Sequence, residues 1–385
     1  MIENFQGLDV RFLLVFFVGI AGYLGFSTYS KKTPVKKSGF YEKVDKNSYK
    51  PPVIKSVDPD FKWEETESVK SYPFKNAAYK LTMSIGKLDP QDWLLMEPTY
   101  KKTIGVKTQI INNVHPDYPD RDLRSCTLFA LPECVPAINE FYDIVVNYMC
   151  DKYPMYFKKE GDKIYNSVTK EYVPASSDGV DAEKLLSSLV GTIEEDFIIL
   201  MKDPTSDSDE YFFKGGVFAF AAGFNPSTKI NTPLTSIHLP IPGYEEKLKV
   251  SMNRFFNRLQ IGQFVTRSNF SIQTHNLYYV DDRNKGHNRP NEEQISIPEE
   301  ELDFDKQVHY RSERQVLTRL PKTEAIVFTI RTYLHPMSEI RNEGEEVCER
   351  LIGAINGLPR EIFLYKAAGE WAEGVKSYLS KYKKS

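Results

Sequence analysis

The sequence predicts an α+β fold in which helices flank an antiparallel sheet and an N-terminal transmembrane helix precedes the folded part. Residues 311–319 and 325–334 both alternate with period two, and Leu320–Thr323 between them fits a tight turn, which together predict a β-hairpin. Other segments carry apolar residues at helical spacing, and the expected strands do not follow a βαβ order. The third observation is an uncharged apolar run near the N-terminus.

The transmembrane anchor is predicted over residues 10–29. Phe12–Phe26 carries no charge, and with its neighbours the run reaches about 18–20 residues, the lower end for a membrane-spanning helix. A secretory signal peptide is the alternative, but the basic residues lie on the wrong side for one, since four lysines occur in residues 31–37. Basic flanks stay cytoplasmic, so we expect a single-pass protein whose C-terminal domain faces the cytosol.

Residues 30–72 are rich in lysine, proline and acidic residues and are expected to form a flexible tether. The folded domain is expected over residues 73–385. The predicted elements of this domain are helices over 135–150, 181–201, 245–259, 345–355 and 370–382, strands over 211–224 and 264–279, and a polar insertion over 281–306.

Composition limits the functions to consider. With 385 residues, 41% of them hydrophobic, the chain can bury one large core or two small ones. A net charge of −3 gives no general reason to expect nucleic acid as a partner. The four cysteines form no C-x-x-C pair, which argues against an iron–sulfur cluster or a zinc ribbon held by this chain alone. Scattered thiols are typical of a reduced intracellular protein, although two disulfides remain possible.

His238 is the candidate metal ligand of the sequence. It lies in the segment Ile237–Gly243 (IHLPIPG), where Pro240 and Pro242 favour extended conformations of the residues before them. We therefore expect His238 on a stiff, extended segment that fixes the direction of its imidazole, as an axial metal ligand requires. A structural histidine is the alternative.

The first strand of the predicted hairpin is unusually polar. Arg311, Glu313 and Arg319 share one face with Leu317, and Arg314 lies on the other face. Such a strand is either a solvated edge of the sheet or a polar site built on a rigid sheet.

Several familiar motifs are absent from the sequence, namely the dinucleotide and P-loop glycine patterns, G-x-S-x-G and H-E-x-x-H. Asp120–Asp122 and Asp207–Asp209 match D-x-D, so a membrane-anchored glycosyltransferase is an alternative function. The expected cytosolic orientation disfavours it.

Three segments carry a resemblance to a known family: Ile237–Gly243 together with Ser251–Phe256, Arg267–Phe270 (RSNF), and Arg311–Tyr333 (RSERQVLTRLPKTEAIVFTIRTY). Over roughly residues 93–379 the chain resembles the alpha-subunit family of haem-dependent oxidative N-demethylases, in a form like its membrane-anchored fungal members. The resemblance implies a PAS-like antiparallel sheet that binds haem b. It also implies oxidation of a small amine with O2 and with electrons from a separate flavin and iron–sulfur reductase.

Carried over to this sequence, the resemblance implies His238 as the proximal ligand of the haem iron and Glu313 as the distal, catalytic carboxylate. Arg267 and Arg314 stand in matching motifs and are suggested as partners of the haem propionates or of the scaffold. Phe270 departs from the family, which commonly has Trp there. A family can keep a cofactor site while its substrate changes, so a haem-binding sensor or carrier without turnover is the second hypothesis.

Overall fold

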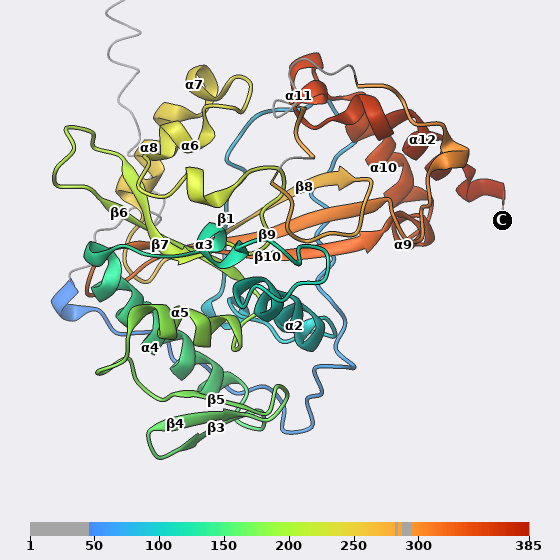
Figure 1. Ribbon diagram of the computed structural model, residues 1–385. Coiled ribbons are helices and arrows are strands. Elements are labelled where there is room, and N and C mark those ends of the chain that lie inside the picture. Colours follow the sequence, from blue (N-terminus) through green and yellow to red (C-terminus); the bar gives the residue numbers. More distant parts are fainter. Residues whose placement is uncertain (1–45, 282–283, 287–293, 385) are drawn as a thin grey trace, which may run out of the picture. The chain divides into compact units, whose positions relative to one another are not determined.

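The computed structural model describes residues 46–281, 284–286 and 294–384, all within one compact unit, Val44–Ser385 (Figure 1). The predicted anchor, residues 10–29, lies outside these ranges. Within them, no helix is both long enough and apolar enough to cross a membrane.

An antiparallel seven-stranded sheet organises the fold, which confirms the α+β prediction. Its order is β1-β8-β9-β10-β6-β7-β2, and each neighbouring pair is antiparallel. The strands are β1 (Gly86–Lys87), β8 (Phe264–Gln273), β9 (His309–Arg319), β10 (Ile326–Pro336), β6 (Asp196–Lys202), β7 (Tyr211–Val217) and β2 (Leu128–Ala130).

The predicted hairpin is the centre of this sheet. β9 and β10 pair from Arg319↔Ile326 to His309↔Pro336, and the carboxylate of Glu140 fastens the turn by accepting hydrogen bonds from the backbone N–H groups of Lys322 and Thr323. β8 pairs along the other side of β9. The solvated-edge interpretation of the first strand is therefore wrong, because β9 has a neighbour on both sides.

One face of the sheet is covered by a layer of helices that bury a large apolar core (Figure 1). Trp93, Phe141, Phe197 and Val327 belong to this core. The elements on this side are α2 (Tyr100–Ile111), α3 (Leu123–Thr127), α4 (Val135–Lys152), α5 (Ala182–Val190), and a small sheet of β3 (Phe157–Glu160), β4 (Lys163–Asn166) and β5 (Glu171–Pro174). The predicted helix over 135–150 is confirmed by α4.

The helix predicted over 181–201 is wrong in its second half. α5 ends at Val190, and residues 196–202 form the buried strand β6. Phe197 and Leu200 happen to continue a helical stripe, but the run Phe197–Met201 is apolar at every position, which is typical of a strand buried on both faces. Phe197 faces the helix layer, whereas Ile198 and Leu200 face the opposite side.

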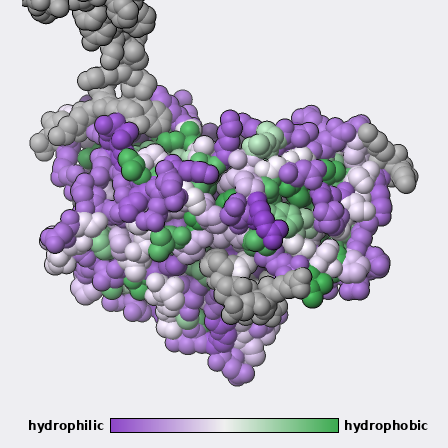
Figure 2. All heavy atoms as spheres, turned by 90° about the horizontal axis from the view of Figure 1, so that it is seen from above, coloured by the Kyte–Doolittle hydropathy of each residue, from purple (hydrophilic) through white to green (hydrophobic). Residues whose placement is uncertain are grey.

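The remaining helices lie over the other face and at one end of the sheet. Figure 2, which views the molecule from above Figure 1, shows a mainly hydrophilic surface with smaller hydrophobic patches. Over this face lie α6 (Leu234–His238), α7 (Tyr244–Lys247) and α8 (Lys249–Arg258), and a second core holds α9 (Met337–Asn342), α10 (Glu345–Asn356), α11 (Arg360–Tyr365) and α12 (Ala368–Ser380). The helices predicted over 345–355 and 370–382 are confirmed, and the one over 245–259 is confirmed with a break at Leu248.

Part of the segment expected to be a tether packs on the fold. Trp63 is 8% exposed and belongs to the large core, and Phe61 packs against that core. The backbone N–H of Val57 donates to the carbonyl oxygen of Lys152. The tether was predicted from the mainly polar composition of the segment, which gives no weight to these few apolar residues. Residues 30–45 lie outside the described ranges.

Candidate functional site

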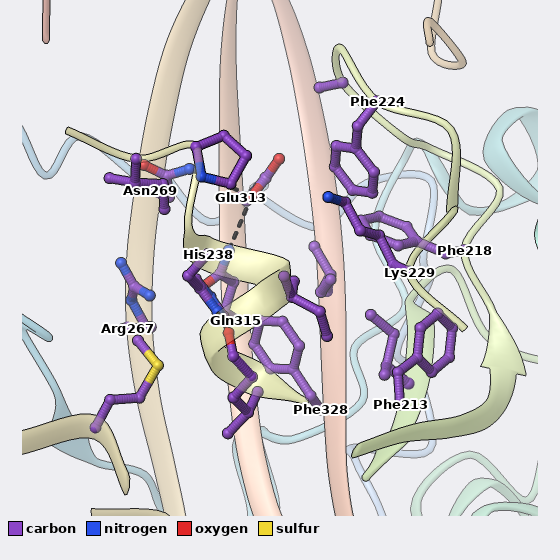
Figure 3. Close-up of a pocket in the computed structure, with 18 of the residues that line it drawn as sticks. Phe213, Phe218, Phe224, Lys229, His238, Arg267, Asn269, Glu313, Gln315 and Phe328 are labelled. Atoms are coloured by element: carbon purple, nitrogen blue, oxygen red, sulfur yellow. Dashed lines mark hydrogen bonds between the residues drawn. The ribbon is translucent and has the colours of Figure 1, made fainter. Parts of the chain in front are cut away.

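A cavity of about 240 Å³ lies between the sheet face opposite the helix layer and the segment that carries α6 (Figure 3). Most of its wall is apolar, with a few polar groups, as is usual for small-molecule sites. The apolar lining includes Ile198, Leu200, Phe213, Phe218, Phe224, Met252, Phe256, Leu317, Phe328 and Ile330, and the polar lining includes Lys229, His238, Arg267, Asn269, Ser271, Lys285, Glu313, Gln315 and Tyr365.

The period of the strands explains why so many polar residues reach this cavity. Alternate side chains of a strand share a face, so Arg267, Asn269 and Ser271 of β8 line the cavity together. Glu313 and Gln315 of β9 do the same. Asn269 stands opposite Glu313 in the ladder, and Arg267 stands opposite Gln315. The polar face predicted from the sequence is therefore a cavity wall.

His238 ends α6 with its ring held in a defined orientation. Its Nδ1 lies 2.8 Å from the carbonyl oxygen of Leu234, and its ring stacks on Tyr244 with centroids 5.3 Å apart. A carbonyl oxygen can only accept, so Nδ1 carries the hydrogen and Nε2 keeps its lone pair. Burial lowers the pKa of His238, and the charges of Arg267 and Lys229 lower it further, so the imidazole is neutral at neutral pH.

The extended conformation expected around His238 is wrong. Pro233 precedes a helical turn that runs through His238, and Leu239 is also right-handed helical although Pro240 follows it. The backbone N–H of Ile237 donates to the Pro233 carbonyl oxygen, and this turn together with the His238–Leu234 bond overrides the local preference before proline. The imidazole is fixed by these contacts rather than by an extended backbone.

The two oxygens of Glu313 have different surroundings. Oε2 accepts hydrogen bonds from Nε2 of Gln315 at 2.8 Å and from Nδ2 of Asn269 at 3.5 Å. Oε1 lies 3.8 Å from Nε of Arg311 and accepts no hydrogen bond from the described residues. The side chain is 17% exposed. One carboxylate oxygen is thus held by the sheet while the other can accept a ligand.

The two predicted arginines lie on opposite faces of the sheet. Arg267 lines the cavity, and its Nε is buried without an acceptor among the described residues. Arg314 is turned to the helix layer, where it donates to the carbonyl oxygens of Trp93 at 3.0 Å and of Asp92. Of the four site residues predicted from the sequence, the cavity brings together His238, Glu313 and Arg267, and Arg314 serves the scaffold.

Sequence reasoning missed several cationic residues at the cavity. Lys229 precedes α6, Lys285 lies in the predicted insertion, and Lys366 follows α11 beside Tyr365, which lines the cavity. Nothing in their local sequence indicates this position, since it depends on how distant segments pack. Asn269 and Gln315, by contrast, could have been found from the strand period.

The D-x-D segments have structural roles away from the cavity lining. Asp122 caps α3 by accepting a hydrogen bond from the backbone N–H of Ser125, and Asp209 pairs with Lys202. In the part of the chain that the structure describes, no group of three or more His, Cys, Asp or Glu side chains is arranged to hold a metal ion.

Comparison with known families gives a match over residues 84–376 to the family described as haem-dependent oxidative N-demethylase, alpha subunit-like. The matched region spans the whole sheet and every residue of the cavity lining except Met83. No curated protein matches the chain.

Proposed function

The chain belongs to the haem-dependent oxidative N-demethylase, alpha subunit-like family, and from this we propose that it binds haem b in the cavity through His238 and demethylates a small amine oxidatively. The observation that carries the proposal is the neutral imidazole of His238, whose Nε2 lone pair is available at the wall of a mainly apolar cavity. Nε2 of a neutral imidazole is a common ligand of haem iron.

The residues around His238 fit such a group. The Leu234 carbonyl oxygen fixes the tautomer, as the partners of metal-bound histidines usually do. Phe213, Phe218 and Phe328 supply apolar surface for a porphyrin. Haem also carries two carboxylates. We infer that Arg267, whose buried Nε lacks an acceptor among the described residues, and Lys229 hold these carboxylates.

When bound, haem would supply the dioxygen and one-electron chemistry, with electrons from a separate flavin and iron–sulfur reductase. Glu313 would hold the substrate through Oε1, because a carboxylate forms a charge-assisted hydrogen bond with a protonated amine and can accept its proton. Gln315 and Asn269 would keep Oε1 in place by binding Oε2. Overall, the amine loses its methyl group as formaldehyde. O2 takes up two electrons and two protons, and one of its oxygen atoms enters the formaldehyde while the other leaves as water.

We propose further that the protein is a membrane-anchored member of the fungal type, with residues 10–29 as a single-pass anchor and the folded domain in the cytosol. The support is the apolar run with basic residues after it. Protease protection on microsomes tests this, because a cytosolic domain is digested while the vesicles are intact. We also propose that the antiparallel sheet is a PAS-like scaffold, in agreement with its ligand-sized cavity on one face.

The absorption spectrum of the purified chain titrated with haem is the first test of the proposal. A Soret band that saturates at one haem per chain is expected, and its absence overturns the proposal. Consumption of reductant with a panel of small secondary amines is the second test. A protein that binds haem and oxygen but consumes no reductant with any amine is a sensor or carrier instead.

A further inference from the structure

Positive charge gathers around Glu313, a carboxylate that lines the cavity. Burial lowers the pKa of Arg267, Lys285 and Lys366, in the last case to about 7, and Glu313 opposes this shift in all three. Glu313 is the one carboxylate among the described residues that line the cavity. Cations withdrawn from water are stable only with acceptors or counter-charges, so we expect an anion to bind near these groups.

Two of the cations near Glu313 donate hydrogen bonds to backbone carbonyl oxygens of the fold. Nζ of Lys366 donates to the carbonyl oxygen of Phe270 at 2.8 Å. Arg311 donates to the carbonyl oxygens of Tyr278 and Phe220. Both cations therefore have acceptors within the fold, and Nε of Arg311, which has no hydrogen-bond partner among the described residues, lies 3.8 Å from Oε1 of Glu313.

Lys285 differs from these two residues. Its Nζ lies 5.0 Å from the ring centroid of Tyr365, and no hydrogen bond or ion pair reaches it from the residues that the structure describes. Lys285 and Tyr365 both line the cavity. The two carboxylates of haem are matched by Lys229 and Arg267 in the proposed function. Lys285 then remains a cavity cation that forms no ion pair with the residues that the structure describes.

We propose that Lys285 forms a carboxylate subsite beside Glu313, and that the substrate is an amine that carries a carboxylate, such as an N-methyl amino acid. The inference rests on the proposed function, because it takes Glu313 as the site of the amine. The zwitterion matches both charges, with its ammonium on Glu313 and its carboxylate on Lys285. A simple amine would satisfy Glu313 and leave Lys285 unmatched.

Calorimetric titration of the full-length protein tests the subsite, with N-methylglycine and N-methyl-β-alanine compared with dimethylamine. At least one of the two amino acids should bind more tightly than dimethylamine. In Lys285→Met, which keeps the apolar stem, that amino acid should bind roughly 10–100-fold more weakly, the usual effect of losing a hydrogen bond to a charged group. Dimethylamine should bind as before, and Lys285→Arg should restore part of the loss. Lys158→Met, at an exposed position on β3 in the small sheet, is the matched control.

The Soret band of the same samples separates the two proposals. A normal band with no preference for either amino acid overturns the subsite and leaves the proposed function intact. A weaker band in Lys285→Met with unchanged amine selectivity assigns Lys285 to a haem carboxylate and also overturns the subsite. A wild-type protein without a Soret band overturns the proposed function. The calorimetric comparison does not require haem, so amino-acid selectivity lost in Lys285→Met would support the carboxylate subsite even then.

Discussion

Nε2 of Gln315 donates a hydrogen bond to Oε2 of Glu313 over 2.8 Å, and the two side chains stand on the same face of β9 (Figure 3). Asn269 binds the same oxygen from the neighbouring strand. Both amides thus act on one carboxylate oxygen, and Oε1 is the oxygen that can receive a substrate. Three residues of a rigid sheet make this arrangement, which is the kind of support a positioned acid–base group requires.

The first prediction concerns Glu313→Gln. The amide keeps the shape of the side chain but lacks the charge and the proton-accepting oxygen. Haem binding should persist, while amine-dependent turnover should fall by roughly 10²–10⁴, the usual contribution of a positioned acid–base group. Reductant consumption at matched haem loading measures this. Glu245→Gln, an exposed carboxylate on α7, is the control. Equal turnover in Glu313→Gln and the wild type would show that Glu313 has a structural role and not a catalytic one.

The second prediction concerns His238→Ala. The substitution removes the only imidazole that lines the described cavity, so the Soret band should be lost or shifted. His309 on β9 provides the control. His309→Ala should leave the band unchanged, because Nδ1 of His309 is bonded to the Gln307 carbonyl oxygen and the residue is outside the cavity lining. An unchanged spectrum in His238→Ala would mean that another residue is the ligand of the haem iron.

The third prediction compares the two arginines. Arg267→Met should weaken haem binding roughly 10-fold or more, because a charge-assisted bond to a carboxylate is lost. Arg314→Met should instead lower the free energy of unfolding by about 1–3 kcal/mol, since the carbonyl groups of Trp93 and Asp92 lose their donor. Haem titration and urea denaturation of both variants separate the roles. If Arg314→Met weakened haem binding and Arg267→Met lowered the free energy of unfolding, the haem would lie on the face of the sheet that carries Arg314.

The fourth prediction concerns the N-terminal segment. Removal of residues 1–30 should release a soluble, folded domain, because the described apolar anchors of the fold begin after this segment, at Ile54, Val57 and Phe61. Size-exclusion chromatography and the haem spectrum of the truncated chain check this. Aggregation of a truncated chain that still binds haem would indicate that the removed run packs on the domain instead of spanning a bilayer.

The sequence was sufficient for the features that depend on local period. The hairpin β9–β10, the helix α4 and the shared face of Glu313 and Leu317 all follow from alternation or helical spacing. β6 was missed because an apolar run that is buried on both faces has no period of its own.

The cations of the cavity could not be predicted from local pattern for a different reason. Lys285 and Lys366 come from segments far apart in the chain. Nζ of Lys285 lies 5.0 Å from the ring centroid of Tyr365 on α11, and Nζ of Lys366 donates to the carbonyl oxygen of Phe270 on β8. Their proximity is a property of tertiary packing. The family resemblance indicated His238 and Glu313 but carried no information on these two lysines.

The last prediction concerns a cluster of buried charges on the other face of the sheet. Arg331 of β10 forms ion pairs with Glu97 at 2.6 Å, with Glu195 at 3.2 Å and with Glu194. Burial raises the pKa of Glu194 to about 7, and the neighbouring Glu195 contributes in the same direction against the effect of Arg331. The folded protein therefore binds a proton at Glu194 more tightly than the unfolded chain does.

The sign of the pH effect follows from this difference. The contribution of Glu194 to stability is complete below its ordinary pKa of 4.5 and is lost as the pH rises through about 7. Glu194→Gln should remove this loss. As the pH rises from 4.5 to 8, the free energy of unfolding of the variant should therefore increase by roughly 1–3 kcal/mol relative to that of the wild type. Urea denaturation of the truncated domain across this range measures it, with the exposed Glu64→Gln as control. If the free energy of unfolding depended on pH in the same way in Glu194→Gln and the wild type, Arg331 would keep Glu194 ionised in the folded state.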